Sequence, residues 1–423
     1  MKIICAQEDH AFDDSDEVLN VVLYKNADRP SRGSAGRMVK DEIARQKLIA
    51  AGKAWDLMSL AMAVSAADLA GHRAESADGW TRVFEIDVSV ADPDFWNSQT
   101  SLVEEFLNFL TTDTWRIHFI GDGFQPTPPQ KPDFPVEDCV SLLSGGLDSF
   151  IGNVDLVADG KKILAVSHVV RGDAEKQTSF ANTLGIRHLQ LNHNAEVPDK
   201  ETPPSQRARS LTFLAYGVLA ATTLKTFHDG AQVPLYVCEN GFISINPPLT
   251  EMRLGSLSTR TTHPVFLSLV QRLLNAADLR VLLLNPYQLK TKGEMLKECK
   301  NQTLLHAYAS QTTSCGRFLQ NGYKHCGRCV PCLVRRAAFI SAGVEDTTVY
   351  RYKNLGKNDA QHAGFDDVRS VAMAVSEVQT DGLESWLGMS LSTALLGDVC
   401  ALESMVGRGL DELKGLLNKY GVT

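Results

Sequence analysis

The stretch Ser141-Leu-Leu-Ser-Gly-Gly-Leu-Asp-Ser149 decides the fold expected for this chain. It begins within a short apolar run, Val140–Leu143, and leads directly into a segment that we expect to be helical. Two adjacent glycines let the backbone turn tightly and approach an anion, while a helix that starts here directs free N–H groups and its positive end toward the same point. We therefore predict a phosphate-binding loop made of Ser144, Gly145, Gly146, Leu147, Asp148 and Ser149.

Asp148 is the unexpected member of this loop, because phosphate alone would repel its carboxylate. A magnesium ion, or a hydrogen bond that stabilises the loop, must account for it. Lysine is missing from the place where a Walker A loop carries it, which argues against transfer of a γ-phosphate. The alternative interpretation is a serine- and glycine-rich turn that binds no ligand.

Further apolar runs follow the loop at Ile163–Val170, Ile186–Leu191, Leu235–Cys238 and Val281–Leu284, and they alternate with helical segments. Continuous apolar runs are typical of strands buried on both faces, which indicates an α/β domain with a parallel sheet. We place this domain at residues 137–345, after a proline- and glycine-rich linker at 123–136. A helical region follows at 346–423.

Residues 1–122 have a mixed pattern, which predicts an α+β domain. Apolar and polar residues alternate over Phe84–Val90 and Trp115–Phe119, as in half-buried strands. The spacing of apolar residues predicts a helix between these strands and a longer helix over Asp41–Leu69.

The composition places the protein among ordinary globular chains. It has 423 residues, 44% of them hydrophobic, and a net charge of −8, which argues against a broad electrostatic contact with nucleic acid. The amino terminus lacks the features of a secretory signal, and no apolar stretch approaches the ~20 residues that span a bilayer. We expect a cytoplasmic protein that contacts no membrane.

Four of the nine cysteines are crowded into one short segment, Cys315–Cys332, as C-x10-C-x2-C-x2-C. In a chain without an export signal, such crowding favours a metal over disulfides. Four thiolates can surround Zn²⁺ and leave no open coordination position, so the ion would be structural. An iron–sulfur cluster is the competing interpretation. The predicted ligands are Cys315, Cys326, Cys329 and Cys332.

Taken together, these motifs resemble known families. The pattern S-G-G-x-D-S is similar to the PP-loop signature of N-type ATP pyrophosphatases, which have an adenine nucleotide alpha hydrolase-like fold. A PP-loop followed by this cysteine knuckle resembles the 7-cyano-7-deazaguanine synthase family over about residues 138–342. Three shorter pieces match that family in order: Arg207–Leu214, in which Ser210 replaces an asparagine, Lys290–Met295 and Thr313–Cys315.

The resemblance implies a reaction. In that family, ATP adenylates 7-carboxy-7-deazaguanine, ammonia converts the adenylate to an amide, and a second ATP-dependent step gives the nitrile. ATP, Mg²⁺ and Zn²⁺ are therefore the implied cofactors. Arg209 and Lys292 carry over as contacts to the phosphates or the adenylate, and together with Asp148 they are the catalytic candidates.

The segment after the apolar run Leu235–Cys238 does not match that family. It follows a buried strand, where ligands of open parallel sheets collect, and its polar side chains can recognise a purine-like edge and a carboxylate. In the alternative interpretation, His263-Pro264 caps a helix and the arginines are solvated. The predicted substrate-binding residues are Glu239, Asn240, Arg253, Arg260 and His263.

The extra terminal regions resemble longer synthase-like proteins found in antiphage defence gene clusters. That resemblance implies a second kind of acceptor, an amine of a partner protein, with an amide as the end product. Two alternatives stay open: a PP-loop enzyme that modifies RNA, and a non-catalytic sensor that binds ATP.

Overall fold

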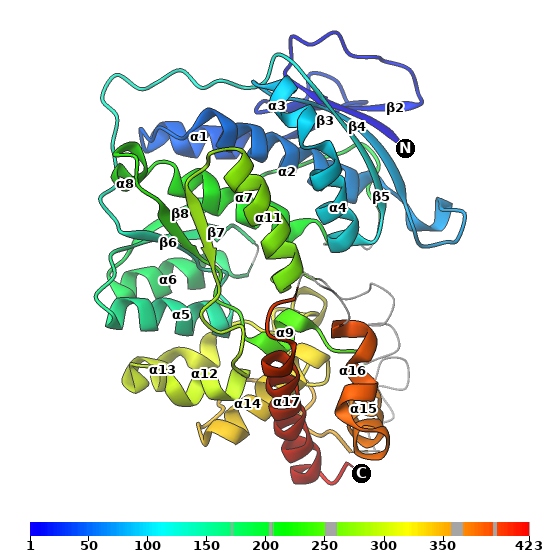
Figure 1. The fold of residues 1–423 in the computed structure, drawn as a ribbon, viewed down its shortest axis with the longest axis vertical. Coiled ribbons are helices and arrows are strands. Elements are labelled where there is room, and N and C mark those ends of the chain that lie inside the picture. The colour runs from blue at the N-terminus through cyan, green and yellow to red at the C-terminus, as the bar shows by residue number, and fades with distance from the viewer. Residues whose placement is uncertain are drawn as a thin grey trace.

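The structure is a computed structural model that describes residues 1–170, 172–202, 205, 207–249, 260–356, 367–391 and 396–422. Two five-stranded sheets lie one above the other, with helices between them, and a group of helices lies below the second sheet (Figure 1). No helix in these ranges is both long enough and apolar enough to cross a membrane.

The first sheet has the order β3-β2-β1-β4-β5, and all its neighbouring strands are parallel. The predicted α+β character of this region is therefore wrong, because a fully parallel sheet with crossover helices is α/β. The alternating burial predicted for the last two strands is confirmed. The strands are β1 (Lys2–Ala6), β2 (Val18–Leu23), β3 (Gly33–Ala35), β4 (Val83–Ser89) and β5 (Thr114–Ile120).

The predicted long helix is two helices, α1 (Arg37–Arg45) and α2 (Gly52–Ala70). The break falls where Lys47 adopts a positive φ of 56° and Leu48 forms a β-bridge with Asp133. The shorter helices of this region are η1 (Arg73–Glu75), α3 (Pro93–Ser98) and α4 (Thr100–Thr111).

The second sheet confirms all five predicted strands, in the order β10-β9-β6-β7-β8, again fully parallel. The central strand, β6, lies between β7 and β9, so the chain leaves it in one direction and later returns on its other side. Such a switch point is where open parallel sheets bind ligands. The strands are β6 (Cys139–Leu142), β7 (Ile163–His168), β8 (Arg187–Leu191), β9 (Val233–Tyr236) and β10 (Val281–Leu284).

Helices cover both faces of this sheet. On the face toward the first sheet lies α7, and α2 packs against it, so that two helical layers separate the sheets. Of the 19 residues of α2, 16 are buried, as expected for a helix enclosed on all sides. The other helices of the region are α5 (Leu147–Ala158), α6 (Ala174–Leu184), α7 (Arg209–Ala221), α8 (Lys225–His228), α9 (Gly241–Ile245), α11 (Pro264–Ala276), α12 (Lys292–Glu298), α13 (Gln302–Tyr308), η2 (Ala309–Gln311), η3 (Leu319–Asn321) and α14 (Val330–Ala342).

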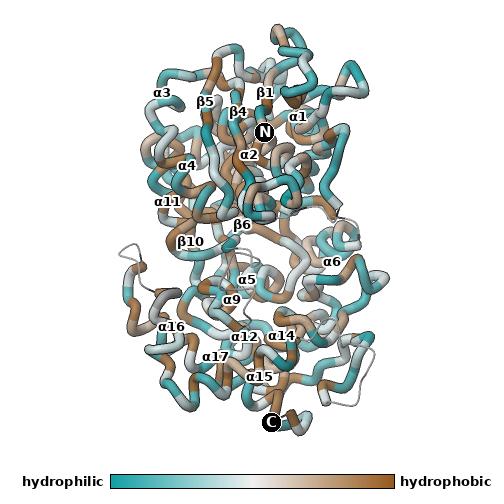
Figure 2. Tube along the Cα trace, turned by 90° about the vertical axis from the view of Figure 1, so that its right-hand side faces the viewer, coloured by the Kyte–Doolittle hydropathy of each residue, from teal (hydrophilic) through white to brown (hydrophobic). Residues whose placement is uncertain are grey.

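The carboxy-terminal region is helical, as predicted, with α15 (Asp367–Asp381), α16 (Leu383–Leu391) and α17 (Val399–Lys419). Helix α17 packs on α14, α12 and α9 below the second sheet. One continuous apolar core runs from β1 through both sheets to α17, and Figure 2 shows hydrophobic segments crossing the middle of the molecule near β6 and β10. The predicted domain boundaries fall between elements, and the division into domains remains a prediction.

Candidate functional site

The predicted phosphate loop joins β6 to α5 at the switch point of the second sheet. Gly145 has a φ of 85°, which favours glycine, and Gly146 is the N-cap of α5. The two serine hydroxyls lie 3.0 Å apart; Ser149 Oγ donates to Gly146 O at 3.1 Å, and Ser144 Oγ accepts from Gly146 N at 3.2 Å. The hydroxyls thus hold the loop in shape and leave the first N–H groups of α5 directed at the space in front of it.

Asp148, on the first turn of α5, is buried and forms an ion pair with Lys292. Lys292 Nζ lies 2.5 Å from Asp148 Oδ1, and the side-chain amide of Asn240 donates to Asp148 Oδ2 at 2.7 Å. The carboxylate therefore has partners within the protein, which answers the question that the sequence raised. These contacts join segments that lie 144 and 92 residues apart in the chain.

Glu239 places a second carboxyl group beside Asp148. Burial and the Asp148 charge raise the pKa of Glu239 well above its ordinary value. Burial also opposes ionisation of Asp148, but the Lys292 ammonium overcomes this and holds the pKa of Asp148 below its ordinary value. The charge of the Asp148 carboxylate is thus balanced within the protein by Lys292.

These residues line one cavity of about 200 Å³ in front of the phosphate loop. Its wall brings together the loop, Glu239, Lys292 and the segment Thr313-Ser314 that leads into the cysteine cluster. Asn240 has a different role from the predicted one, because both ends of its amide are occupied. Its Nδ2 donates to Asp148, and its Oδ1 accepts from Ile243 N at 3.0 Å as the N-cap of α9.

Arg209 lies at a second cavity, of about 310 Å³, at the carboxyl ends of β7 and β8. Two histidines that the sequence reasoning missed, His168 and His193, line the same cavity with their rings 5.0 Å apart. Burial, helped by Arg209, lowers the pKa of His193 to about 4, so its ring is neutral at pH 7. The sequence held a signal for both histidines. His168 lies near the end of one strand-like apolar run and His193 follows another, at the edge where ligands of a parallel sheet collect.

Two buried polar atoms near Arg209, His168 Nδ1 and Ser210 Oγ, have no hydrogen-bond partner among the described residues. Buried polar groups are nearly always satisfied, so the unpaired His168 Nδ1 in the cavity wall offers a partner to a bound ligand or water. Helix α2 of the amino-terminal region supplies Ser65 and Asp68 to this cavity, which therefore lies between the two sheets.

The structure places Arg260 and His263 away from both cavities. Arg260 donates to Phe109 O at 3.1 Å and lies over the Phe109 ring, at 4.6 Å. His263 is the N-cap of α11, accepts from Val265 N at 3.3 Å and has its ring 5.0 Å from that of Phe109. Both side chains contact Phe109 of α4, and their contact with substrate stays a prediction. Arg253 lies outside the described residues.

The four predicted cysteines are brought together and buried, with all their Sγ atoms within 4.8 Å of one another. The Sγ atoms of Cys315 and Cys329, and of Cys326 and Cys332, lie 3.9 Å apart. Tetrahedral bonds of 2.3 Å to one Zn²⁺ place thiolates about 3.8 Å apart, so the donor set fits a single ion. A cluster of several iron atoms needs the sulfurs further apart.

Backbone N–H groups also point at these sulfurs. Cys326 N donates to Cys315 Sγ at 3.3 Å, and Cys329 N donates to Cys326 Sγ at 3.2 Å. Hydrogen bonds of this kind stabilise thiolates. The cluster adjoins the first cavity through Thr313 and Ser314, so a bound ion would fix one wall of the phosphate site.

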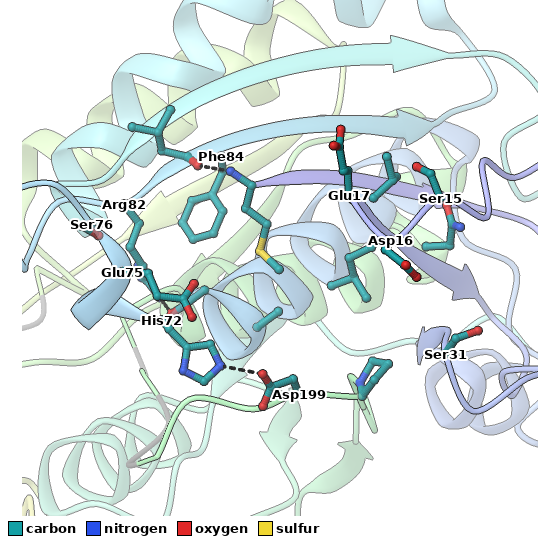
Figure 3. Close-up of a pocket in the computed structure, with 18 of the residues that line it drawn as sticks. Ser15, Asp16, Glu17, Ser31, His72, Glu75, Ser76, Arg82, Phe84 and Asp199 are labelled. Carbon is teal, nitrogen blue, oxygen red and sulfur yellow. Dashed lines mark hydrogen bonds and ion pairs between the residues drawn. The ribbon is translucent and has the colours of Figure 1, made fainter.

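A third cavity, of about 750 Å³, lies at the amino ends of β1, β2 and β4 (Figure 3). The one buried arginine in its wall, Arg82, is neutralised by Asp68 and Asp113, each at 2.6 Å, and His72 lies 3.3 Å from Asp199. An acidic wall of this kind disfavours phosphate. Its acidic residues are Asp14, Asp16, Glu17, Glu75 and Asp199.

The chain is similar to proteins of one known family. A family model described as queuosine biosynthesis protein QueC matches residues 261–343. The 7-cyano-7-deazaguanine synthase of Sinorhizobium fredii is 37% identical over 241 residues, which are 50% of this chain and 91% of that protein. That of Rhizobium etli is 27% identical over 259 residues, 54% of this chain and 99% of that protein. That of Methanocaldococcus jannaschii is 24% identical over 239 residues, 50% and 98% of the two chains.

Nearly the whole length of each synthase thus aligns with about half of this chain. This chain belongs to the 7-cyano-7-deazaguanine synthase (QueC) family, with additional sequence beyond the synthase length.

Proposed function

We propose that this protein uses ATP to adenylate the carboxylate of a 7-deazaguanine, 7-carboxy-7-deazaguanine, and releases pyrophosphate. The relatives are named as synthases of the corresponding nitrile, 7-cyano-7-deazaguanine. The observation that carries the proposal is the buried Asp148–Lys292 pair, which stands in the cavity directly in front of the phosphate loop.

The two cavities suggest how ATP lies. The loop and the amino end of α5 suit the outer phosphates, because free N–H groups and the helix dipole favour negative charge there. The cavity at Arg209 suits the nucleoside, since it has neutral histidines and unpaired polar atoms. The α-phosphate then lies between them, near the sheet edge.

In the first step, a carboxylate oxygen of the substrate attacks the α-phosphorus, and the bond to the bridging oxygen of the β-phosphate breaks. Negative charge builds on the leaving pyrophosphate. Lys292 has three N–H donors, so it can keep its bond to Asp148 and still donate to a phosphate oxygen. Arg209, at the nucleoside cavity, can pair with the α-phosphate or the adenylate, and the buried setting strengthens both interactions. Glu239 lines the cavity and is the remaining candidate to contact the exocyclic amine of the base.

Two metal ions fit the residues present. Glu239 offers carboxyl oxygens, which are hard ligands of the kind that Mg²⁺ prefers. The oxygens of Asp148 already bind Lys292 and Asn240, so an ion bound to Asp148 would displace one of these partners. The four cysteines would hold Zn²⁺ in a closed, structural site.

In the second step, an amine attacks the adenylate carbonyl carbon, AMP leaves and an amide forms. Ammonia is the acceptor that leads through the amide to the nitrile. The resemblance to longer proteins of antiphage clusters supports an amine of a partner protein as the other acceptor. The extra regions of the chain offer surface for such a partner.

The test is to incubate the protein with ATP, Mg²⁺ and 7-carboxy-7-deazaguanine, adding ammonia, a candidate partner protein or neither, and to identify all products by mass spectrometry. We expect AMP and pyrophosphate, with the nitrile only where ammonia is the acceptor and a mass gain on the partner where a protein is. Lys292→Met is the inactive control. Formation of ADP and inorganic phosphate in place of AMP and pyrophosphate would refute the proposal.

A further inference from the structure

Helix α17 contacts both segments that complete the phosphate site, although it lies beyond the part of the chain that the family model matches. One of these segments carries Lys292 at the start of α12. The other carries Glu239 and Asn240 directly before α9 (Figure 1).

The first contact is made by Glu412, which stands beside the start of α12. Its carboxylate accepts hydrogen bonds from the hydroxyl of Thr291 and, at 3.3 Å, from the N–H of Gly293. These are the two neighbours of Lys292 in the chain. A side chain at position 293 would overlap the Glu412 carboxylate, so the approach depends on glycine.

An ion pair also fixes the same end of α12. Arg408, one helical turn before Glu412, lies 2.5 Å from Glu294 and also donates to Leu289 O at 2.9 Å. Glu294 in turn forms a capping box with Thr291, so α17 and the cap of α12 make one connected network.

The third contact is apolar and reaches the other segment. Gly409 lies on the face of α17 shared with Met405 and Glu412, and a Cβ there would overlap the buried ring of Phe242 in α9. Glycine within a helix lowers the stability of the helix relative to alanine. Its presence at this point is explained by the close approach of α9, whose N-cap is Asn240.

We infer that α17 is part of the catalytic apparatus: Glu412 is a positioning residue for Lys292, and Gly409 lets α9 carry Asn240 to Asp148. The inference rests on the proposed function for its assay of turnover. Helix α17 thus positions the two segments that carry the partners of Asp148, Lys292 and Asn240.

The test compares Glu412→Ala with Asp411→Asn, a change at the exposed neighbouring position of the same helix. Misplacing a reacting group by about 1 Å can cost a hundred-fold, so we expect kcat of Glu412→Ala to fall by roughly ten- to a hundred-fold. The KM for the carboxylate should change little, and Asp411→Asn should stay within about twofold of the wild type. Glu412→Gln, which keeps one acceptor oxygen, should recover part of the loss.

A binding cycle separates positioning from loss of fold. The Kd for ATP is measured for the wild type, Glu412→Ala, Lys292→Met and the double variant. The Glu412→Ala substitution should weaken ATP binding when Lys292 is present. It should have no further effect on ATP binding in the Lys292→Met background. Equal weakening in both backgrounds would overturn the inference, as would unchanged turnover and binding in Glu412→Ala.

The two proposals fail in different ways. If the wild type forms AMP and Glu412→Ala does so equally fast, only the role of α17 is refuted. If no protein forms AMP but the binding cycle shows the coupling, the proposed reaction is refuted and the positioning by α17 stands. Gly409→Ala gives an independent measurement: it should lower kcat through α9, and full activity would refute that half of the inference.

Discussion

Replacing Lys292 with methionine tests the electrostatics of the site most directly. The exposed fractions of the Lys292 and Asp148 side chains are 7% and 5%, so neither charge has water to replace a lost partner. Methionine nearly fills the space, which keeps the cavity term small. Breaking a buried ion pair from one side costs about 3–5 kcal/mol, and we expect this loss in the free energy of unfolding at pH 8.

The loss should depend on pH with a definite sign. Without Lys292, burial raises the pKa of Asp148 above its unfolded value, so the folded variant binds a proton that the unfolded chain does not. Its stability then falls as pH rises. We therefore expect Lys292→Met to be closer to wild type at pH 5 than at pH 8.

Asp148→Asn should lower the free energy of unfolding by less, about 1–3 kcal/mol, because it removes hydrogen bonds to a charged group. With the Asp148 charge removed, the pKa of Glu239 falls, and Glu239 can ionise to pair with Lys292. The double variant has neither charge and should regain most of the loss of Lys292→Met.

The assay is urea unfolding of the four proteins at both pH values, with zinc present throughout. A coupling free energy of about 2 kcal/mol or more between the two positions is the expected outcome. If Lys292→Met unfolds at the wild-type urea concentration at both pH values, the two groups do not form a buried pair and the reasoning fails.

Three further predictions concern other residues. Cys329→Ser should bind less zinc, measured by elemental analysis, and lose several kcal/mol of stability; full zinc content would contradict the cysteine site. Arg260→Leu should lower the melting temperature, through loss of about 1–2 kcal/mol of contacts with Phe109, and leave the KM for ATP and for the carboxylate unchanged; a raised KM would return Arg260 to the substrate site. Burial lowers the pKa of His263 to about 3, so the wild type should lose up to about 1.4 kcal/mol per pH unit between pH 6.5 and 4 relative to His263→Asn, which keeps the N-cap acceptor but does not titrate; parallel pH profiles of unfolding would refute this.

The second sheet and the centre of the site could be predicted from sequence because their signals are local. A fully buried parallel strand is a short apolar run, and the loop from Ser144 to Ser149 is a contiguous motif. Glu239 was found because it follows a buried strand, and the carboxyl ends of parallel strands meet at one edge. The partners of Asp148 could be guessed only through such rules or through the family.

What could not be predicted depends on contacts distant in the chain. The polar groups of Arg260 and His263 suit a ligand equally well, and only the structure shows that both contact Phe109 on α4. Glu412 lies 121 residues from the Thr291 hydroxyl that it binds, and nothing in its local sequence distinguishes it from a solvated glutamate. The direction of β1 relative to β2 likewise has no local signal.

The double layer formed by α2 and α7 has a consequence for any attempt to divide the protein. Ser65 of α2 and Thr212 of α7 share a buried hydrogen bond of 2.7 Å between the two sheets. A shortened chain without the amino-terminal region would lose this hydrogen bond and turn the apolar side of α7 to water. Such a fragment should aggregate rather than act as a minimal enzyme, so the amino-terminal region is better regarded as a partner in folding than as a detachable accessory.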